Sequence, residues 1–111
     1  MSTLSTHVLD TMNGRPAAGM ALVLGGPGGE IARGTTNADG RCPELAPAGL
    51  APGRYWIRFG VADYFRRLGV ALPDPPFLGE VTVDFGIAAG GGHYHVPLLV
   101  SPYGYSTYRG S

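Results

Sequence analysis

The sequence contains three histidines, His7, His93 and His95, and the last two are separated by one residue. Successive side chains of a β-strand point to opposite faces, so residues i and i+2 share a face. A strand through this segment would therefore present two imidazoles to the same side. Because histidine is the side chain best matched to proton transfer near neutral pH, the pair is a candidate acid–base centre.

The same three imidazoles could instead bind zinc and leave a fourth position open for water. Two strand histidines that share a face are, however, more often surface or interface residues. Residues 89–92 carry no side-chain acceptor that could orient a ligating imidazole. We therefore keep a three-histidine zinc site as an alternative to a site that uses neither a metal nor an organic cofactor.

An arginine and the chain terminus could complete such a centre. Arg41 directly follows the turn signal Asn-Ala-Asp-Gly at 37–40, where a loop can present its side chain. A guanidinium offers planar, paired donors to an oxyanion or to the carbonyls of a planar heterocycle. The chain ends in Tyr-Arg-Gly-Ser at 108–111, soon after the apolar residues 98–100. Termini are usually frayed and chemically bland. Because this one is rich in tyrosine, serine and arginine, we expect it to be packed into a site.

The composition excludes several classes of function. Eight basic residues, all arginine, balance eight acidic ones, so the chain lacks the positive surplus that nucleic acid or an anionic membrane requires. The single cysteine, Cys42, excludes an internal disulfide and a Cys-based zinc site, and we expect it to be a small buried residue. No apolar run reaches membrane-spanning length and no secretion signal is evident, which favours a soluble, cytoplasmic protein.

Glycine and proline punctuate the sequence every eight to twelve residues, which is typical of short strands joined by turns. In the first strand, Leu4, Thr6 and Val8 alternate with outward-facing residues such as His7. The pattern predicts strands over 4–10, 20–24, 31–36, 54–59, 80–87, 93–100 and 105–108, and one short helix over 61–68 that covers a sheet.

The glycine-rich stretches are interpreted as connections. Residues 25–29 (GGPGG) predict a flexible loop, and they lack the lysine and the following helix of a phosphate-binding loop. Residues 88–92 predict a hairpin connection between the last two long strands. Residues 46–53 and 72–77 also predict loops. Residues 1–111 are therefore expected to form a single all-β domain, a sandwich of seven or eight strands with one short helix.

Three segments resemble the 5-hydroxyisourate hydrolases, the enzymatic branch of the transthyretin-related family. They are LSTHVLDTMNGRP at 4–16, TNADGR at 36–41 and YHVPLLVSPYGYSTYRGS at 94–111. Further similarity at Tyr55, 62–65 and 80–81 extends the resemblance over nearly the whole chain. The C-terminal segment is highly specific. The resemblance implies a transthyretin-like β-sandwich.

The resemblance also implies a set of site residues. The hormone-carrying transthyretins lack the two histidines, the arginine and the tail at these positions, so a non-catalytic carrier of a small ligand is the second hypothesis. His93 is not among the catalytic residues that the resemblance implies, and Gly92 stands where the hydrolases often have an acidic residue. The implied catalytic residues are His7, Arg41, His95, Tyr108 and Ser111, and the implied substrate-binding residues are Arg41, Tyr108, Arg109, Gly110 and Ser111.

The implied reaction is the hydrolysis of 5-hydroxyisourate, an unstable product of urate oxidation, to 2-oxo-4-hydroxy-4-carboxy-5-ureidoimidazoline. The two histidines would activate water and transfer protons, and the arginine would bind the developing oxyanion. Tyr108 and Ser111 would orient the ring or the water, while Arg109 and the terminal carboxylate would fix the tail. The family assembles as a homotetramer, a dimer of dimers with active sites at the dimer–dimer interface, and we expect the same assembly here.

Overall fold

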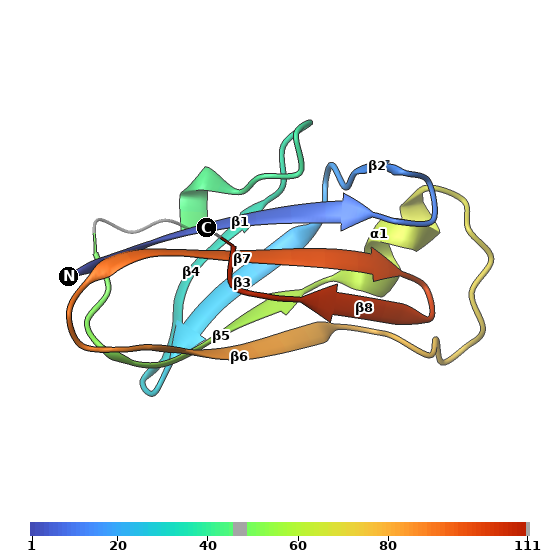
Figure 1. The fold of residues 1–111 in the computed structure, drawn as a ribbon. Helices are drawn as coiled ribbons and strands as arrows, with labels where there is room; N and C mark the ends of the chain where they lie inside the picture. Colours follow the sequence, from blue (N-terminus) through green and yellow to red (C-terminus); the bar gives the residue numbers. More distant parts are fainter. Residues whose placement is uncertain (46–48, 111) are drawn as a thin grey trace.

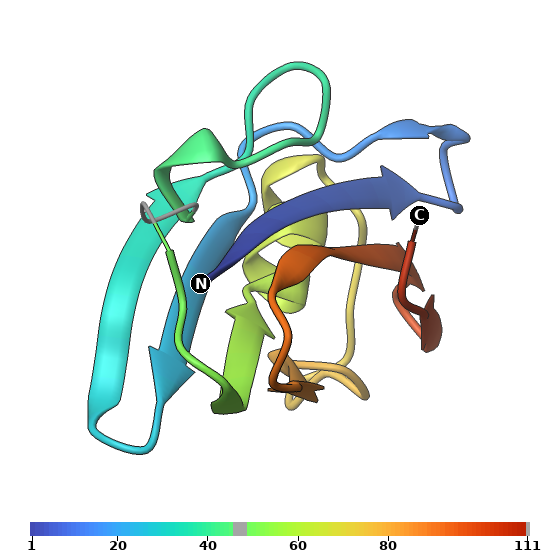
Figure 2. The ribbon, with the colours of Figure 1, turned by 60° about the vertical axis from the view of Figure 1, so that its left-hand side comes forward.

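The computed structural model describes residues 1–45 and 49–110, which form two four-stranded sheets packed face to face (Figures 1 and 2). The strand orders are β2-β1-β7-β8 and β4-β3-β5-β6. The expected all-β sandwich with one short α-helix is confirmed. The elements are β1 (Ser2–Asp10), β2 (Arg15–Pro16), β3 (Ala21–Gly26), β4 (Gly29–Thr35), a 3-10 helix (Pro43–Leu45), β5 (Gly53–Phe59), α1 (Val61–Arg67), β6 (Val81–Ile87), β7 (Gly92–Ser101) and β8 (Gly104–Thr107).

The two ends of the chain meet in the first sheet. β1 and β7 lie side by side and pair in parallel, from Ser2 opposite Gly92 to Asp10 opposite Val100. β8 then pairs antiparallel with β7 (Figure 1). This pairing brings the N-terminal strand next to the C-terminal histidines, which are almost ninety residues away along the chain.

The core lies between the inner faces of the two sheets. The expected alternation of β1 is confirmed, because Leu4, Thr6 and Val8 are buried while Ser5 and His7 are partly exposed. In the opposite sheet Ile57 and Phe59 of β5 are fully buried, and three inward residues of β6 are buried as well, namely Val81, Val83 and Ile87. Cys42 is buried as expected. The outer face of the first sheet is therefore held in place by a well-packed inner face.

Helix α1 covers one end of the sandwich directly after β5 (Figure 1). Val61 and Phe65 are fully buried in the same core as the strands. The Tyr64 hydroxyl donates a hydrogen bond of 2.7 Å to the buried carboxylate of Asp10 at the end of β1. This bond fixes the helix to the first sheet. No helix in the described residues is long and apolar enough to cross a membrane.

Two expectations about the connections were wrong. Most of residues 25–29 belongs to strands β3 and β4, and only residues 27–28 form the turn between them. Residues 88–92 are not a hairpin connection, because β6 and β7 belong to different sheets. Gly90, Gly91 and Gly92 have φ angles of 111°, 76° and 115°, a conformation that favours glycine and lets the chain cross between the sheets. The short strand β2 was not predicted, and residues 46–48 of one expected loop lie outside the described residues.

Candidate active site

The outer face of β1 and β7 carries the polar residues predicted for the site. Ser5 lies opposite His95 in the parallel pair, and His7 lies opposite Pro97. His93 and His95 share this face as expected, because both contact Ser5 while Tyr94 between them is buried on the inner face. Two residues along a parallel strand span about 6.6 Å, so His7 lies about that far along β1 from the Ser5–His95 pair.

A continuous series of short contacts connects four side chains on this face. The Ser5 Oγ atom lies 2.7 Å from Nδ1 of His95 and 2.8 Å from Nε2 of His93. The Thr3 Oγ1 atom lies 2.7 Å from Nδ1 of His93. The contact to Ser5 leaves Nε2 of His95 as the ring nitrogen that can face a substrate or a water molecule.

A tight turn places Arg41 next to His7. The Asn37 side-chain oxygen accepts hydrogen bonds from the backbone N–H groups of Asp39 and Arg41, and Gly40 has φ of 75°. A Cβ atom on Gly40 would lie 2.5 Å from the Val8 carbonyl oxygen, so only glycine fits there. Directly after the turn, the backbone of Arg41 pairs with that of His7 in an isolated antiparallel β-bridge. The arginine is thus brought to the histidine face by the turn that the sequence indicated.

The C-terminal tail runs against His95. The Gly110 N–H donates a hydrogen bond of 2.8 Å to the His95 carbonyl oxygen. A Cβ atom on Gly110 would lie 2.5 Å from Cδ2 of the His95 ring, so the backbone passes too close for any side chain. Ser111 lies outside the described residues. Gly110 therefore reaches the site through its backbone.

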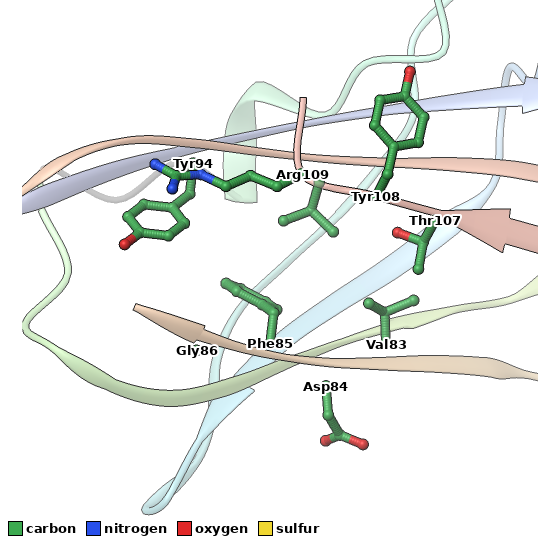
Figure 3. A pocket seen from close by; sticks show the side chains of 9 residues that line it. Val83, Asp84, Phe85, Gly86, Tyr94, Thr107, Tyr108 and Arg109 are labelled. Atoms are coloured by element: carbon green, nitrogen blue, oxygen red, sulfur yellow. The ribbon is translucent and has the colours of Figure 1, made fainter. Parts of the chain in front are cut away.

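Tyr108 and Arg109 line a cavity of about 220 Å³ between β6 and the tail (Figure 3). Figure 3 shows Arg109 reaching toward Tyr94, and its guanidinium carbon lies 3.9 Å from the centre of that ring. Arg109 also donates a hydrogen bond of 3.2 Å to the His93 carbonyl oxygen. Because Tyr94 faces inward, this cavity lies on the opposite side of β7 from the histidines. Arg109 is therefore placed to hold the tail, and the cavity is separate from the histidine face.

The surroundings of His95 favour a neutral imidazole. Partial burial lowers the pKa of His95 below its usual value, and electrostatic interaction with Arg41 and, to a smaller extent, with the His7 and His93 rings lowers it further. Protonation of the ring would place one more positive charge beside the guanidinium. His95 is consequently unprotonated, and able to accept a proton, at neutral pH.

Removing the Arg41 charge should raise the pKa of His95. The variant Arg41→Gln removes the largest of the electrostatic causes and leaves the burial of the ring unchanged. Titration of the His95 imidazole followed by NMR measures the effect. The control Arg54→Gln changes an exposed arginine of the other sheet and should leave the titration unchanged. An unaltered His95 pKa in Arg41→Gln would mean that the guanidinium does not act on the ring.

The geometry gives no support to the zinc alternative. Among the described residues, no group of three His, Cys, Asp or Glu side chains is arranged to hold a metal ion. Both ring nitrogens of His93 lie within hydrogen-bond distance of hydroxyl groups, and Nδ1 of His95 does as well. The three imidazoles therefore do not converge on one point.

Comparison with known proteins places the chain in a family. The model of the HIUase/Transthyretin family matches residues 4–110. The chain belongs to this family. One HIUase/Transthyretin relative, 5-hydroxyisourate hydrolase 2 of Rhizobium meliloti, is 54% identical over 97% of this chain and 95% of its own length.

Solved structures of the HIUase/Transthyretin family have the same fold. The structure of Klebsiella pneumoniae 5-hydroxyisourate hydrolase is similar with a TM-score of 0.88 and 40% identity over the whole of both chains. Sea bream transthyretin in complex with thyroxine is similar with a TM-score of 0.83 and 29% identity, covering 96% of this chain and 93% of that one. The fold is thus shared by a hydrolase and by a transthyretin in complex with thyroxine, so the fold alone does not distinguish the two activities.

The sequence did not single out Thr3, Ser5 or Gly40. Thr3, Ser5 and His7 stand two residues apart along β1, so all three lie on one face. The contacts of Thr3 and Ser5 with the C-terminal histidines depend on the pairing of β1 with β7. Gly40 was part of the predicted turn, and its close approach to β1 needed the folded structure. The only signal in the sequence was that two hydroxyl-bearing residues, Thr3 and Ser5, precede His7 by four and two positions.

Proposed function

We propose that the protein hydrolyses 5-hydroxyisourate at the outer face of β1 and β7. The observation that carries this proposal is the placement of His7, Arg41 and His95 on one face of the sheet, with the backbone of Gly110 packed against the last of them. These groups come from the two ends of the chain and from one turn. They supply proton acceptors, proton donors and a positive charge on one surface, which are the requirements for opening a cyclic amide.

His95 is the proposed general base. Its pKa is lowered by burial and by neighbouring positive charges, and its Nδ1 atom is held by Ser5. Nε2 would take a proton from water as the water oxygen attacks the C6 carbonyl carbon. Arg41 would stabilise the negative charge that develops on the carbonyl oxygen. The C6–N1 bond then breaks, and N1 receives a proton from a histidine, for which His7 is the proposed donor.

The tail would orient the reacting groups. Gly110 limits the movement of the His95 ring, and Arg109 anchors the tail on Tyr94 and on the His93 carbonyl. Tyr108 is 58% exposed, so its hydroxyl is free to reach a substrate or a second chain. Ser111 and the terminal carboxylate are proposed to contact the substrate or the attacking water.

A homotetramer, a dimer of dimers with the active sites at the dimer–dimer interface, is the proposed assembly. β6 and β8 are the outermost strands at one edge of the sandwich, where a second chain could pair with them. β8 is exposed along its length and Tyr105 on it is 49% exposed. The histidine face is open in the single chain, so a facing subunit would be needed to exclude bulk water while the attacking water molecule stays bound.

Activity should be lost when the tetramer dissociates into dimers. Each dimer would retain the histidines and the arginine but would lose the facing subunit that closes the site. Activity and molar mass are measured on the same dilution series, the latter by light scattering. A dimer with full activity would contradict the interface site.

Product analysis distinguishes the hydrolase from a carrier. With substrate in large excess over protein, the hydrolase should yield a product heavier by one water molecule faster than a protein-free sample does, over many turnovers per chain, as measured by mass spectrometry. A transthyretin-like carrier would bind the substrate in proportion to the protein without this product. Binding without turnover would therefore replace the proposed function by the carrier.

Residues 1–111 are proposed to act as one domain, since both sheets and α1 contribute to one cluster of buried side chains. The cytoplasm is the proposed location, and cell fractionation tests it.

A further inference from the structure

We propose that Ser5, His93 and Thr3 form a proton relay that carries the proton taken up by His95 to solvent. This inference rests on the proposed function, in which His95 is the base. The four side chains are joined by three contacts of 2.7, 2.8 and 2.7 Å, each within the range of a hydrogen bond. The relay assigns a role to His93, which lies outside the set of residues that act on the substrate.

The sheet holds the relay in place. Thr3 is the direct partner of His93 in the parallel pair, and Ser5 is the direct partner of His95. All four side chains extend from the same outer face of β1 and β7, whose inner faces are packed in the core. The contacts therefore follow from the strand register and do not depend on a mobile loop.

The exposure of the side chains gives the relay a direction. His95 and Ser5 are partly buried, whereas His93 and Thr3 are exposed. A proton that enters at His95 would therefore leave at the end of the series that water can reach. This route runs along the outer face in the direction away from His7 and Arg41.

The chemistry of the groups allows two consistent arrangements of hydrogen atoms. A hydroxyl donates one hydrogen bond and accepts others, and a neutral imidazole has one donor nitrogen and one acceptor nitrogen. In the first arrangement, His95 Nδ1–H donates to Ser5, Ser5 donates to Nε2 of His93, and His93 Nδ1–H donates to Thr3. Nε2 of His95 then carries a free lone pair. In the second arrangement every donor and acceptor is exchanged.

The passage of one proton through the relay converts the first arrangement into the second. Nε2 of His95 gains a proton from the attacking water, and Nδ1 of the same ring passes its proton to Ser5. The Ser5 hydroxyl proton moves to Nε2 of His93, whose Nδ1 proton moves to Thr3. Thr3 releases its original hydroxyl proton to solvent water. One proton enters and one leaves, no group is oxidised or reduced, and His95 becomes neutral with a proton on Nε2. After the product has left, the reverse shift restores the first arrangement: Nε2 of His95 gives its proton to solvent water and Thr3 takes one up from solvent, so that Nε2 is again free to act as the base.

Ser5 could also act by orientation alone, so the test must separate the two roles. Ser5→Ala removes the link between the rings, and Ser5→Thr retains the hydroxyl. His93→Gln retains a hydrogen-bonding partner for Ser5, because an amide can donate or accept. The amide cannot pass a proton as an imidazole does. Only a relay predicts the same loss in His93→Gln as in Ser5→Ala.

The decisive experiment measures kcat, KM and the dependence of kcat on the fraction of D2O. Wild-type protein should show a curved dependence, because several protons move together. Ser5→Ala and His93→Gln should each lower kcat by roughly 10- to 100-fold, with KM nearly unchanged and a linear dependence on D2O. Ser5→Thr should recover most of the rate and the curvature.

Other results would overturn the relay. Wild-type rate and curvature in His93→Gln, with a loss in Ser5→Ala alone, would show that Ser5 only orients His95. If wild-type protein hydrolysed no substrate, the proposed function would fail separately. The hydrogen-bonded series would still be tested by NMR, since His93→Gln should then change the Nδ1 chemical shift of His95 through Ser5. An unchanged shift would mean that the rings are not linked.

Discussion

Replacing His95 by asparagine should lower kcat by about 10²–10⁴-fold, the range typical of a positioned acid or base. Asparagine retains a polar group near Ser5 but has no nitrogen that accepts a proton at neutral pH. The pKa of His95 is held low by burial and by Arg41, so the native ring is neutral and is available as the base. Steady-state rates with freshly generated 5-hydroxyisourate measure the loss.

A matched control separates this effect from general damage to the sheets. Thr35→Ala changes an exposed strand residue of β4, at the far edge of the other sheet, and should keep the wild-type rate. The folded state of His95→Asn is checked by its thermal unfolding. A kcat within about threefold of wild type in a folded His95→Asn protein would exclude His95 as the base.

Removing residues 109–111 should abolish activity and leave the fold intact. The truncation loses the Gly110 hydrogen bond to His95, worth about 0.5–1.5 kcal/mol, and the Arg109 contact with Tyr94, worth about 0.5–1 kcal/mol. These losses are small beside the roughly 5–15 kcal/mol by which domains are usually stable. The inward-facing strands all precede the tail. Thermal unfolding should remain cooperative while the turnover rate falls to background.

The variant Gly110→Ala tests, with a single added carbon atom, whether activity depends on the packing of the tail against His95. Its Cβ atom would lie 2.5 Å from Cδ2 of His95, so the tail or the ring must move. We expect a large fall in kcat with little change in thermal stability. The control Gly104→Ala adds a carbon atom to β8 whose nearest neighbour would be the Ser101 Oγ atom, 4.0 Å away, which is ordinary contact. Loss of folding on truncation would instead show that the tail is a structural staple, and full activity would exclude it from the site.

Local patterns in the sequence were sufficient to predict most strands. The alternation of Leu4, Thr6 and Val8 predicted which face of β1 is buried, because a half-buried strand has a period of two. The same rule placed His93 and His95 together. The short helix was predicted to within one residue at its C-terminal end. The turn before Arg41 was predicted because asparagine and glycine favour that backbone conformation.

The pairing of distant strands could not be predicted from these patterns. The parallel contact of β1 with β7 brings Ser5 to His95, and nothing in either segment specifies that register. The connection at 88–92 was mistaken for a hairpin because glycine permits a tight turn and a crossing between sheets equally well. Contacts such as that of Gly110 with His95 likewise arise only when the tail is folded. The resemblance to a known family pointed to the site residues, and the structure supplied the hydrogen-bonding partners of His95.

The most direct measurement is the ultraviolet signal of 5-hydroxyisourate, generated by urate oxidase, with and without this protein and with and without a metal chelator. A decay accelerated by catalytic amounts of protein, and unchanged by the chelator, is the predicted result. No acceleration by a folded tetramer would contradict the hydrolase and favour the carrier. Loss of the acceleration on chelation would contradict a metal-free site built from His7, Arg41 and His95.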